Sequence, residues 1–217
     1  MSSTGPQGTG VSKCVVVTGA TGDAGRAASA ALLTAGHRVV AVGSNEDRLA
    51  SVEATARFVC DLTDAAATKE LAERVRSELG PADALVHVVG GWRAGNGNDD
   101  WEWLEPRILT TLRLATLAFV DDLSASGAGR LVTIGSISAT RPSWSGANYS
   151  VLKTAASAWV AAVASGWRKA GTAAAIEILV RAIGDDGTAP GVIAGKIVEL
   201  MGGNATDLNG SRVDLSV

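Results

Sequence analysis

The only tyrosine of the chain, Tyr149, is followed by Lys153 at the spacing of one helical turn. On a helix this spacing places both side chains on one face. Ser136 follows an apolar stretch, 131–134, that has the composition of a buried strand. A phenol has a pKa near ~10, but an adjacent ammonium stabilises its phenolate. These residues predict proton exchange with a carbonyl or alcohol oxygen, with Tyr149 as general acid and base and Ser136 hydrogen-bonded to the same oxygen.

A glycine-rich turn separates the first apolar stretch, 14–17, from the first helical segment, 24–36. Its glycines stand at positions 19, 22 and 25. They let the chain turn sharply and bring backbone amides close to a pyrophosphate, and the following helix adds partial positive charge. The turn therefore predicts dinucleotide binding, with contacts from Gly19, Thr21, Gly22, Asp23 and Ala24.

The residues after the second apolar stretch indicate which dinucleotide is bound. An acidic side chain there hydrogen-bonds the adenosine ribose and repels a 2′-phosphate. Here the position holds Gly43 and Ser44, whereas Arg26 and Arg48 could supply positive charge. We therefore expect NADP as the cofactor, with Ser44 near the phosphate. NAD remains the alternative, in which case both arginines are solvated surface residues.

Strand-length apolar stretches alternate with longer helical segments along the chain. The predicted strands are 14–17, 38–42, 57–60, 84–89, 130–134, 175–180 and 211–215. The predicted helices are 24–36, 65–79, 101–124, 147–169 and 191–201. Near-continuous apolar strands are buried on both faces, as in parallel sheets covered by helices. The fold class is therefore α/β, a doubly wound Rossmann fold of about seven parallel strands with helices on both faces.

Length and composition favour one domain and exclude several classes of partner. The 217 residues predict a flexible tail over 1–12 and a single domain over 13–217. Apolar residues make up 47%, charged residues 19%, and the net charge is −3, so we expect no nucleic-acid partner. No apolar run reaches membrane-spanning length, and we expect a cytoplasmic protein. Cys14 and Cys60 are interpreted as buried thiols, and no metal site is expected.

From residue 12 to 217 the chain resembles the short-chain dehydrogenase/reductase family. The resemblance rests on Ser136, on the Tyr149–Lys153 pair and on the Asp61-Leu62 pair after the third strand. It implies NAD(P)-dependent oxidoreductase activity, with Asp61 and Leu62 near the adenine and Lys153 on the nicotinamide ribose. It also implies cofactor contacts from Gly90, Gly184 and Thr188.

Three departures from the family pattern bear on the site. The family's Asn-Asn-Ala-Gly is His87-Val88-Val89-Gly90 here, and we interpret His87 as structural. The segment 101–124 lacks the family's relay asparagine, and Thr110 or Thr111 lies nearest. Only two residues separate Thr188 from the next helical segment, so the substrate-covering loop is shortened and the crevice should be open.

Two of the six tryptophans lie in loops expected to border the crevice, Trp92 and Trp144. They predict an aromatic wall for a bulky or aromatic substrate, although packing roles are equally compatible with the sequence. The other four tryptophans are expected to pack between helices or at an interface. The alanine-rich segment 147–169 favours a homodimer or homotetramer.

The leading hypothesis is a carbonyl reductase or alcohol dehydrogenase acting on a small-molecule ketone or alcohol. The intact Ser136, Tyr149 and Lys153 favour this enzyme. A dinucleotide-binding regulatory or scaffold protein with little turnover remains an alternative because the relay asparagine and the loop are missing. An epimerase or dehydratase that uses the bound cofactor is a further alternative.

Overall fold

A single parallel sheet organises the part of the chain that the computed structural model describes, residues 11–216. Its strand order is β3-β2-β1-β4-β5-β6-β7, and each neighbouring pair is parallel. The strands are β1 (Cys14–Thr18), β2 (Arg38–Gly43), β3 (Ala56–Val59), β4 (Ala84–His87), β5 (Gly129–Ser136), β6 (Ala173–Val180) and β7 (Arg212–Asp214). The order reverses between β1 and β4, which confirms the predicted doubly wound Rossmann fold and places the ligand crevice at that reversal.

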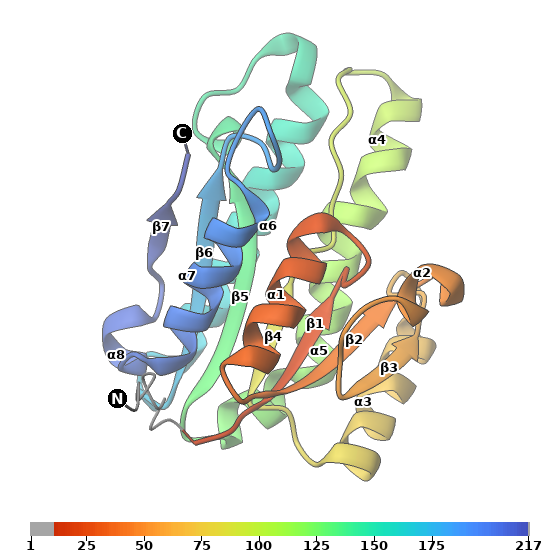
Figure 1. Ribbon diagram of the computed structural model, residues 1–217. Coiled ribbons are helices and arrows are strands. Elements are labelled where there is room, and N and C mark those ends of the chain that lie inside the picture. Colours follow the sequence, from red (N-terminus) through yellow and green to blue (C-terminus); the bar gives the residue numbers. More distant parts are fainter. Residues whose placement is uncertain (1–10, 217) are drawn as a thin grey trace, which may run out of the picture.

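Helices cover both faces of this sheet (Figure 1). They are α1 (Asp23–Thr34), α2 (Glu46–Ala50), α3 (Ala65–Leu79), α4 (Asn98–Glu105), α5 (Thr111–Ala125), α6 (Ala147–Trp167), α7 (Pro190–Gly202) and α8 (Ala205–Leu208). The helices α1 and α7 pack together on one face, and α3, α5 and α6 pack on the other. Residues 1–10 of the predicted tail and residue 217 lie outside the described residues.

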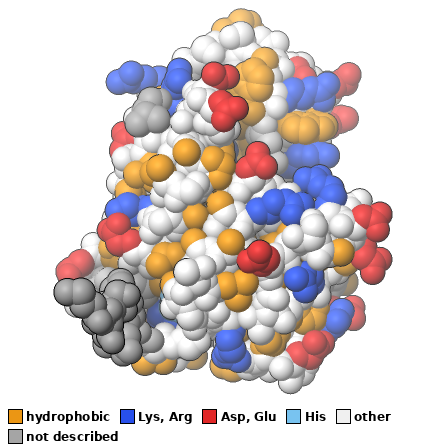
Figure 2. All heavy atoms as spheres, in the orientation of Figure 1, with side chains coloured by type: hydrophobic (Ala, Val, Ile, Leu, Met, Phe, Trp, Pro, Cys, Tyr) orange, Lys and Arg blue, Asp and Glu red, His pale blue; other side chains and the backbone are white. Residues whose placement is uncertain are grey.

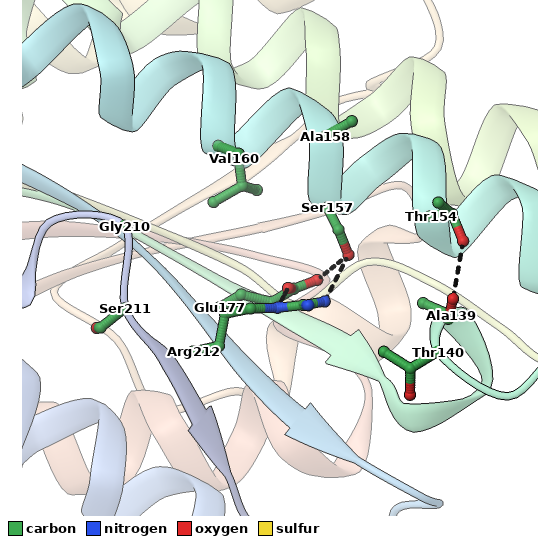
Figure 3. Close-up of a pocket in the computed structure, with 11 residues that line it drawn as sticks. Ala139, Thr140, Thr154, Ser157, Ala158, Val160, Glu177, Gly210, Ser211 and Arg212 are labelled. Carbon is green, nitrogen blue, oxygen red and sulfur yellow. Dashed lines mark hydrogen bonds and ion pairs between the residues drawn. The ribbon is translucent and has the colours of Figure 1, made fainter.

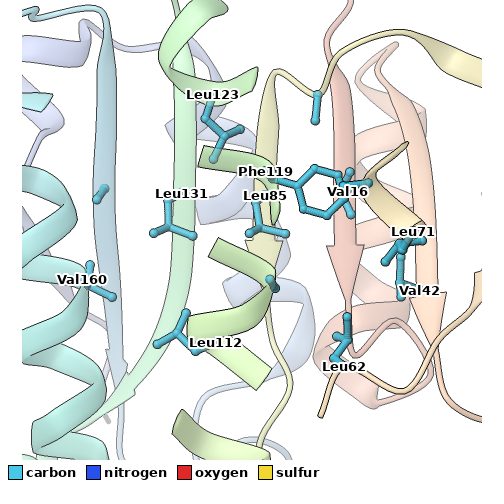
Figure 4. Packing of buried hydrophobic residues seen from close by; sticks show 14 of the residues in the cluster. Val16, Val42, Leu62, Leu71, Leu85, Leu112, Phe119, Leu123, Leu131 and Val160 are labelled. Carbon is cyan, nitrogen blue, oxygen red and sulfur yellow. The ribbon is translucent and has the colours of Figure 1, made fainter. Parts of the chain in front are cut away.

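The core consists of two apolar layers separated by the sheet. On the α5 side, Phe119, Leu112 and Leu123 pack over Leu85 and Leu131 (Figure 4). Every residue of β6 is buried. Burial of one such leucine or phenylalanine side chain contributes about 1.5–3 kcal/mol. These layers fix the strand ends from which the functional side chains extend.

The segment expected as one crossover helix, 101–124, is divided by a π-helical turn. The turn spans Pro106–Thr110, between α4 and α5. Pro106 has no N–H to donate within the helix, which accounts for a wider turn at this point. The hydroxyl of Thr111 donates to the carbonyl of Arg107 at 2.9 Å. The irregular turn borders a cavity whose wall includes Pro106 and Arg107.

Two further observations concern the described residues. None of their helices is long and apolar enough to cross a bilayer. Cys14 and Cys60 are both buried free thiols, as interpreted from the sequence.

Candidate active site

The helix α6 carries Tyr149 and Lys153 toward the end of β5. The Nζ atom of Lys153 lies 5.8 Å from the centre of the Tyr149 ring and donates to the Ile134 carbonyl at 2.9 Å. Ser136 ends β5, is buried, and lies close enough to Tyr149 for its hydroxyl to lower the pKa of the phenol. Its Oγ also accepts the backbone N–H of Ser138 at 3.2 Å. The structure thus brings the three predicted catalytic side chains together.

Burial dominates the protonation behaviour of this group. It raises the pKa of the Tyr149 phenol, and the Ser136 hydroxyl opposes that rise. It lowers the pKa of Lys153 to about 8, and the negative charge of Glu177 acts in the opposite direction. Tyr149 is therefore a protonated phenol at neutral pH. The sequence suggested that Lys153 would set the phenol's pKa, whereas burial has the larger influence in this structure.

A cavity of about 510 Å³ opens beside Tyr149 at the carboxyl ends of the central strands. Seven residues predicted from the sequence line it: Gly22, Asp23, Ala24, Gly90, Trp92, Tyr149 and Lys153. The sequence reasoning missed other lining residues that follow β4, β5 and β6: Val88, Val89, Gly91, Ile134, Gly135, Val180, Arg181, Ala182 and Ile183. Their positions directly after or at the ends of strands were the signal that could have identified them.

The glycine turn leaves open space where a pyrophosphate would run. Gly19 has φ +75°, and a Cβ there would lie 2.8 Å from the Val89 nitrogen. A Cβ on Gly25 would lie 2.3 Å from the Gly19 oxygen. At Gly22 the same atom would meet only the Gly19 oxygen, at 3.6 Å. Since no side chain caps α1 at Gly22, the first amides of this helix are available to an anion. The turn therefore fits a dinucleotide.

A second cavity, of about 680 Å³, continues from Gly22 and Gly90 toward β2 and β3. The predicted residues that line it are Gly19, Thr21, Gly22, Ser44, Asp61, Leu62 and Gly90. Arg48 also lines it, and one of its guanidinium nitrogens donates to the Thr21 carbonyl at 3.3 Å. Basic side chains gather on the side of the molecule where α2 lies (Figure 2).

The two arginines singled out from the sequence differ in position. The guanidinium of Arg26 donates to the Ser51 hydroxyl and to the carbonyls of Thr21 and Arg48. Arg26 is not among the residues that line the described cavities, whereas Arg48 is. Arg48 is therefore the better placed cation for a phosphate beside Ser44.

Four predicted site residues line neither cavity in the described structure, namely Ser136, Gly184, Thr188 and Trp144, and Ser136 is buried beside the first one. The Thr188 hydroxyl is buried and donates to the Leu215 carbonyl at 2.6 Å. Gly184, with φ +111°, donates its N–H to the Thr188 carbonyl at 3.1 Å, which closes the short loop between them. Trp144 is 81% exposed and lines neither cavity. Trp92 is the tryptophan that borders the site.

His87 ends β4 beneath the crevice and is buried. Thr18 Oγ1 lies 2.8 Å from its Nδ1, and Thr111 Oγ1 lies 3.4 Å from its Nε2. Burial and the charge of Lys153 lower the pKa of His87 to about 3. Because Thr111 donates its own proton to a carbonyl, we assign the imidazole proton to Nε2. A neutral imidazole that joins β1, β4 and α5 supports its interpretation as a structural residue.

A family model described as short chain dehydrogenase matches residues 13–194, which include the glycine turn, Ser136, Tyr149 and Lys153. The chain belongs to the short-chain dehydrogenase family. Members of this family are expected to bind a nicotinamide cofactor. The two joined cavities have room for such a dinucleotide.

Curated relatives of this chain are identical to it at about three tenths of the aligned positions. 2,3-dihydro-2,3-dihydroxybenzoate dehydrogenase of Bacillus subtilis is 31% identical over 66% of this chain and 60% of its own length. 3beta-hydroxysteroid dehydrogenase of Mediterraneibacter gnavus is 31% identical over 70% of this chain and 59% of its own length. The chain thus spans about three fifths of the length of these relatives.

Solved structures share the fold over nearly the whole chain. The NADPH-bound short chain oxidoreductase of Pseudomonas aeruginosa PAO1, which contains an atypical catalytic center, has a TM-score of 0.86 at 21% identity. The match covers 94% of this chain and 95% of that one. Ligand-free aldohexose dehydrogenase of Thermoplasma acidophilum has a TM-score of 0.84 at 17% identity, over 94% and 92% of the two chains. These likenesses concern the fold.

Proposed function

We propose that this short-chain dehydrogenase is a carbonyl reductase or alcohol dehydrogenase that uses NADP in preference to NAD. The observation that carries the proposal is the convergence of Ser136, Tyr149 and Lys153 beside a cavity that continues into the glycine turn. The substrate is a small-molecule ketone or alcohol.

The chemistry follows from the groups at the cavity. When bound, the reduced nicotinamide supplies a hydride to the carbonyl carbon. Tyr149 donates its phenolic proton to the carbonyl oxygen, so that the ketone becomes an alcohol. The Ser136 hydroxyl, whose influence lowers the pKa of Tyr149, donates a hydrogen bond to the same carbonyl oxygen. The Lys153 ammonium stabilises the phenolate that remains and binds the nicotinamide ribose, as in the family it belongs to.

The preference for NADP rests on the adenosine cavity. Ser44 and Arg48 line its wall next to the end of β2, and no carboxylate stands at Gly43 or Ser44 to repel a 2′-phosphate. A guanidinium forms charge-assisted hydrogen bonds with a phosphate. Two structural neighbours are NADPH-bound, the Pseudomonas oxidoreductase and a variant of actinorhodin polyketide ketoreductase with a TM-score of 0.84. They support the proposal by likeness of fold.

The experiment is a screen of ketones and alcohols with NADPH, NADP, NADH and NAD, read at the nicotinamide absorbance. Calorimetric titration with each cofactor accompanies it. We expect turnover of at least one carbonyl compound and tighter binding of NADPH than of NADH. Tight cofactor binding with no turnover of any substrate class would instead support the regulatory alternative. Tighter binding of NADH would overturn the NADP assignment.

A further inference from the structure

A buried carboxylate lies on the face of the sheet that α6 covers. Glu177 is in the middle of β6, where its register neighbours are Thr133 on β5 and Arg212 on β7. Only 4% of Glu177 is exposed. The other side chains of this strand are Ala, Ile, Leu and Val. A carboxylate in such an interior is costly unless it is paired, so its presence requires an explanation.

The partners of Glu177 come from α6 and β7. Ser157 donates its hydroxyl to Glu177 Oε1 at 2.6 Å, and Arg212 Nε donates to Oε2 at 2.8 Å. Figure 3 shows these three side chains pointing toward one another at the wall of a cavity of about 300 Å³. The Oγ of Ser157 also lies 3.0 Å from the carbonyl oxygen of Lys153, one helical turn earlier. The group thus touches the backbone of the residue that carries the ammonium.

Gly135 brings the carboxylate close to the catalytic strand. A Cβ on Gly135 would lie 2.3 Å from Glu177 Oε1, so the carboxylate occupies the space that a side chain would need. The preceding residue, Ile134, accepts the hydrogen bond from Lys153 Nζ, and the following residue is Ser136. The carboxylate is therefore packed against Gly135. The residue before Gly135 binds Lys153, and the residue after it is the catalytic Ser136.

We propose that Glu177 is a positioning residue of the catalytic centre: its buried carboxylate keeps Lys153 an ammonium and, through Ser157, fixes the helical turn that bears it. The charge of Glu177 raises the pKa of Lys153, against the lowering caused by burial. Without that carboxylate the ammonium would be lost nearer to neutral pH. The competing explanation is that the Glu177–Arg212 ion pair only attaches β7 to the sheet.

Among the described residues, Glu177 is the one whose negative charge raises the pKa of Lys153, although other ionisable groups, Asp23 included, lie around it. The groups that face it or line its cavity are Tyr149 from α6, His87 from β4, Asp23 from α1 and Arg181 after β6. Tyr149 and His87 are neutral, as their pKa values are raised and lowered respectively. Charges on the packed helices have other partners: Asp100 with Arg93, Glu105 with Thr110, Arg107 with Trp103 and Arg113 with Trp159.

The test compares two variants that break the same ion pair, Glu177→Gln and Arg212→Gln. Trace acetic anhydride labels lysines in proportion to their unprotonated fraction, and mass spectrometry of the peptide with Lys153 gives its pKa in the cofactor-free protein. In Glu177→Gln we expect the pKa of Lys153 to fall by roughly one unit or more. In Arg212→Gln the carboxylate keeps the hydrogen bond from Ser157 while a positive charge is removed, so the pKa of Lys153 should stay unchanged or rise. Equal falls in both variants, or no fall in Glu177→Gln, would overturn the proposal.

A double variant guards against a failure of Glu177→Gln to fold. Glu177→Gln with Arg212→Gln replaces the ion pair by two amides that can bond each other, and the same fall in the Lys153 pKa is expected. An unchanged pKa in the folded double variant would contradict the proposal.

A second readout addresses catalysis and rests on the proposed function. The pH above which NADPH binding and kcat/KM decline should shift downward in Glu177→Gln and not in Arg212→Gln. The labelling measurement needs no cofactor or substrate. A shifted Lys153 pKa without any turnover would therefore support the role of Glu177 while counting against the proposed enzyme. If Glu177→Gln is active and its binding and kcat/KM decline above the same pH as in the wild type, the proposal itself is contradicted.

Discussion

The two halves of the crevice share Gly22, Val88, Val89 and Gly90 but are built in different ways. The adenosine half is formed largely by turns after β1, β2 and β3, and its polar groups are backbone amides and exposed side chains such as Ser44 and Asp61. The nicotinamide half depends on buried side chains, namely Ser136 and Lys153, with His87 and Glu177 behind them. Binding in the first half therefore depends on empty space and main-chain shape. Chemistry in the second half depends on protonation states that burial controls.

The largest effect is expected where the chemistry depends on one proton. Tyr149→Phe removes only the phenolic oxygen, and turnover should fall by about 10²–10⁴-fold because general acid catalysis is lost. Cofactor binding should stay close to wild type, since the glycine turn is untouched. Turnover and calorimetric titration of the same preparation measure both. Near-normal turnover in this variant would show that the nicotinamide half is wrongly assigned.

The next pair of variants separates the shape of the glycine turn from its function. Gly25→Ala places a methyl 2.3 Å from the Gly19 oxygen and should reduce the free energy of unfolding by roughly 1–3 kcal/mol. Gly22→Ala is its matched control, because that methyl meets only an atom at 3.6 Å. This variant should keep its stability but bind cofactor weakly, since the methyl occupies the space for the pyrophosphate. Denaturant unfolding and cofactor titration distinguish them, and strong binding by Gly22→Ala would argue against a dinucleotide there.

A smaller effect is expected at the outer wall of the adenosine half. Arg48→Ala should weaken NADPH binding by roughly tenfold, which corresponds to one charge-assisted hydrogen bond of about 1.5 kcal/mol. NADH lacks the 2′-phosphate and serves as the internal control, with an affinity expected to change little. Fluorescence titration with both cofactors measures the ratio. An equal loss for both cofactors would mean that Arg48 supports the turn through Thr21 and does not select the cofactor.

The smallest effect concerns the substrate side of the nicotinamide half. Trp92 lines the cavity and is 69% exposed, whereas Trp144 is 81% exposed and lies outside it. Trp92→Ala should raise KM by roughly fivefold, since about 40 Å² of lost apolar contact corresponds to about 1 kcal/mol. Trp144→Ala should have less effect, and cofactor binding should be unchanged in both. A larger KM change in Trp144→Ala would place the substrate on the other side of the opening.

The sequence predicted the fold better than it predicted the surroundings of the site. Apolar strands and the glycine turn are local signals, and they located both ends of every strand in the described sheet to within two residues. The Tyr149–Lys153 spacing likewise identified one helical face. These features depend on neighbours in the chain, which periodicity and spacing report directly.

Contacts between distant segments could not be read from the sequence. The π-helical turn before α5 arises from Pro106 within an otherwise helical pattern. The orientation of Thr188 depends on the carbonyl of Leu215, and the Arg26 guanidinium is drawn away from the cavity by its bonds to Ser51 and to the Arg48 carbonyl. Glu177 stands out in the sequence as the one charged residue of an apolar strand, but its partners Ser157 and Arg212 follow only from the packing of β6 against α6 and β7.

The neutral imidazole of His87 makes the stability of the folded chain depend on pH. His87 has a pKa of about 3 in the folded chain, against an ordinary value of 6.5. Between these two values the unfolded chain binds a proton that the folded chain excludes, so this residue makes the folded state less stable as pH falls through that range. The stability contributed by keeping His87 neutral is fully present above pH 6.5. The same burial that joins β1, β4 and α5 at His87 thus makes the folded chain less stable in acid.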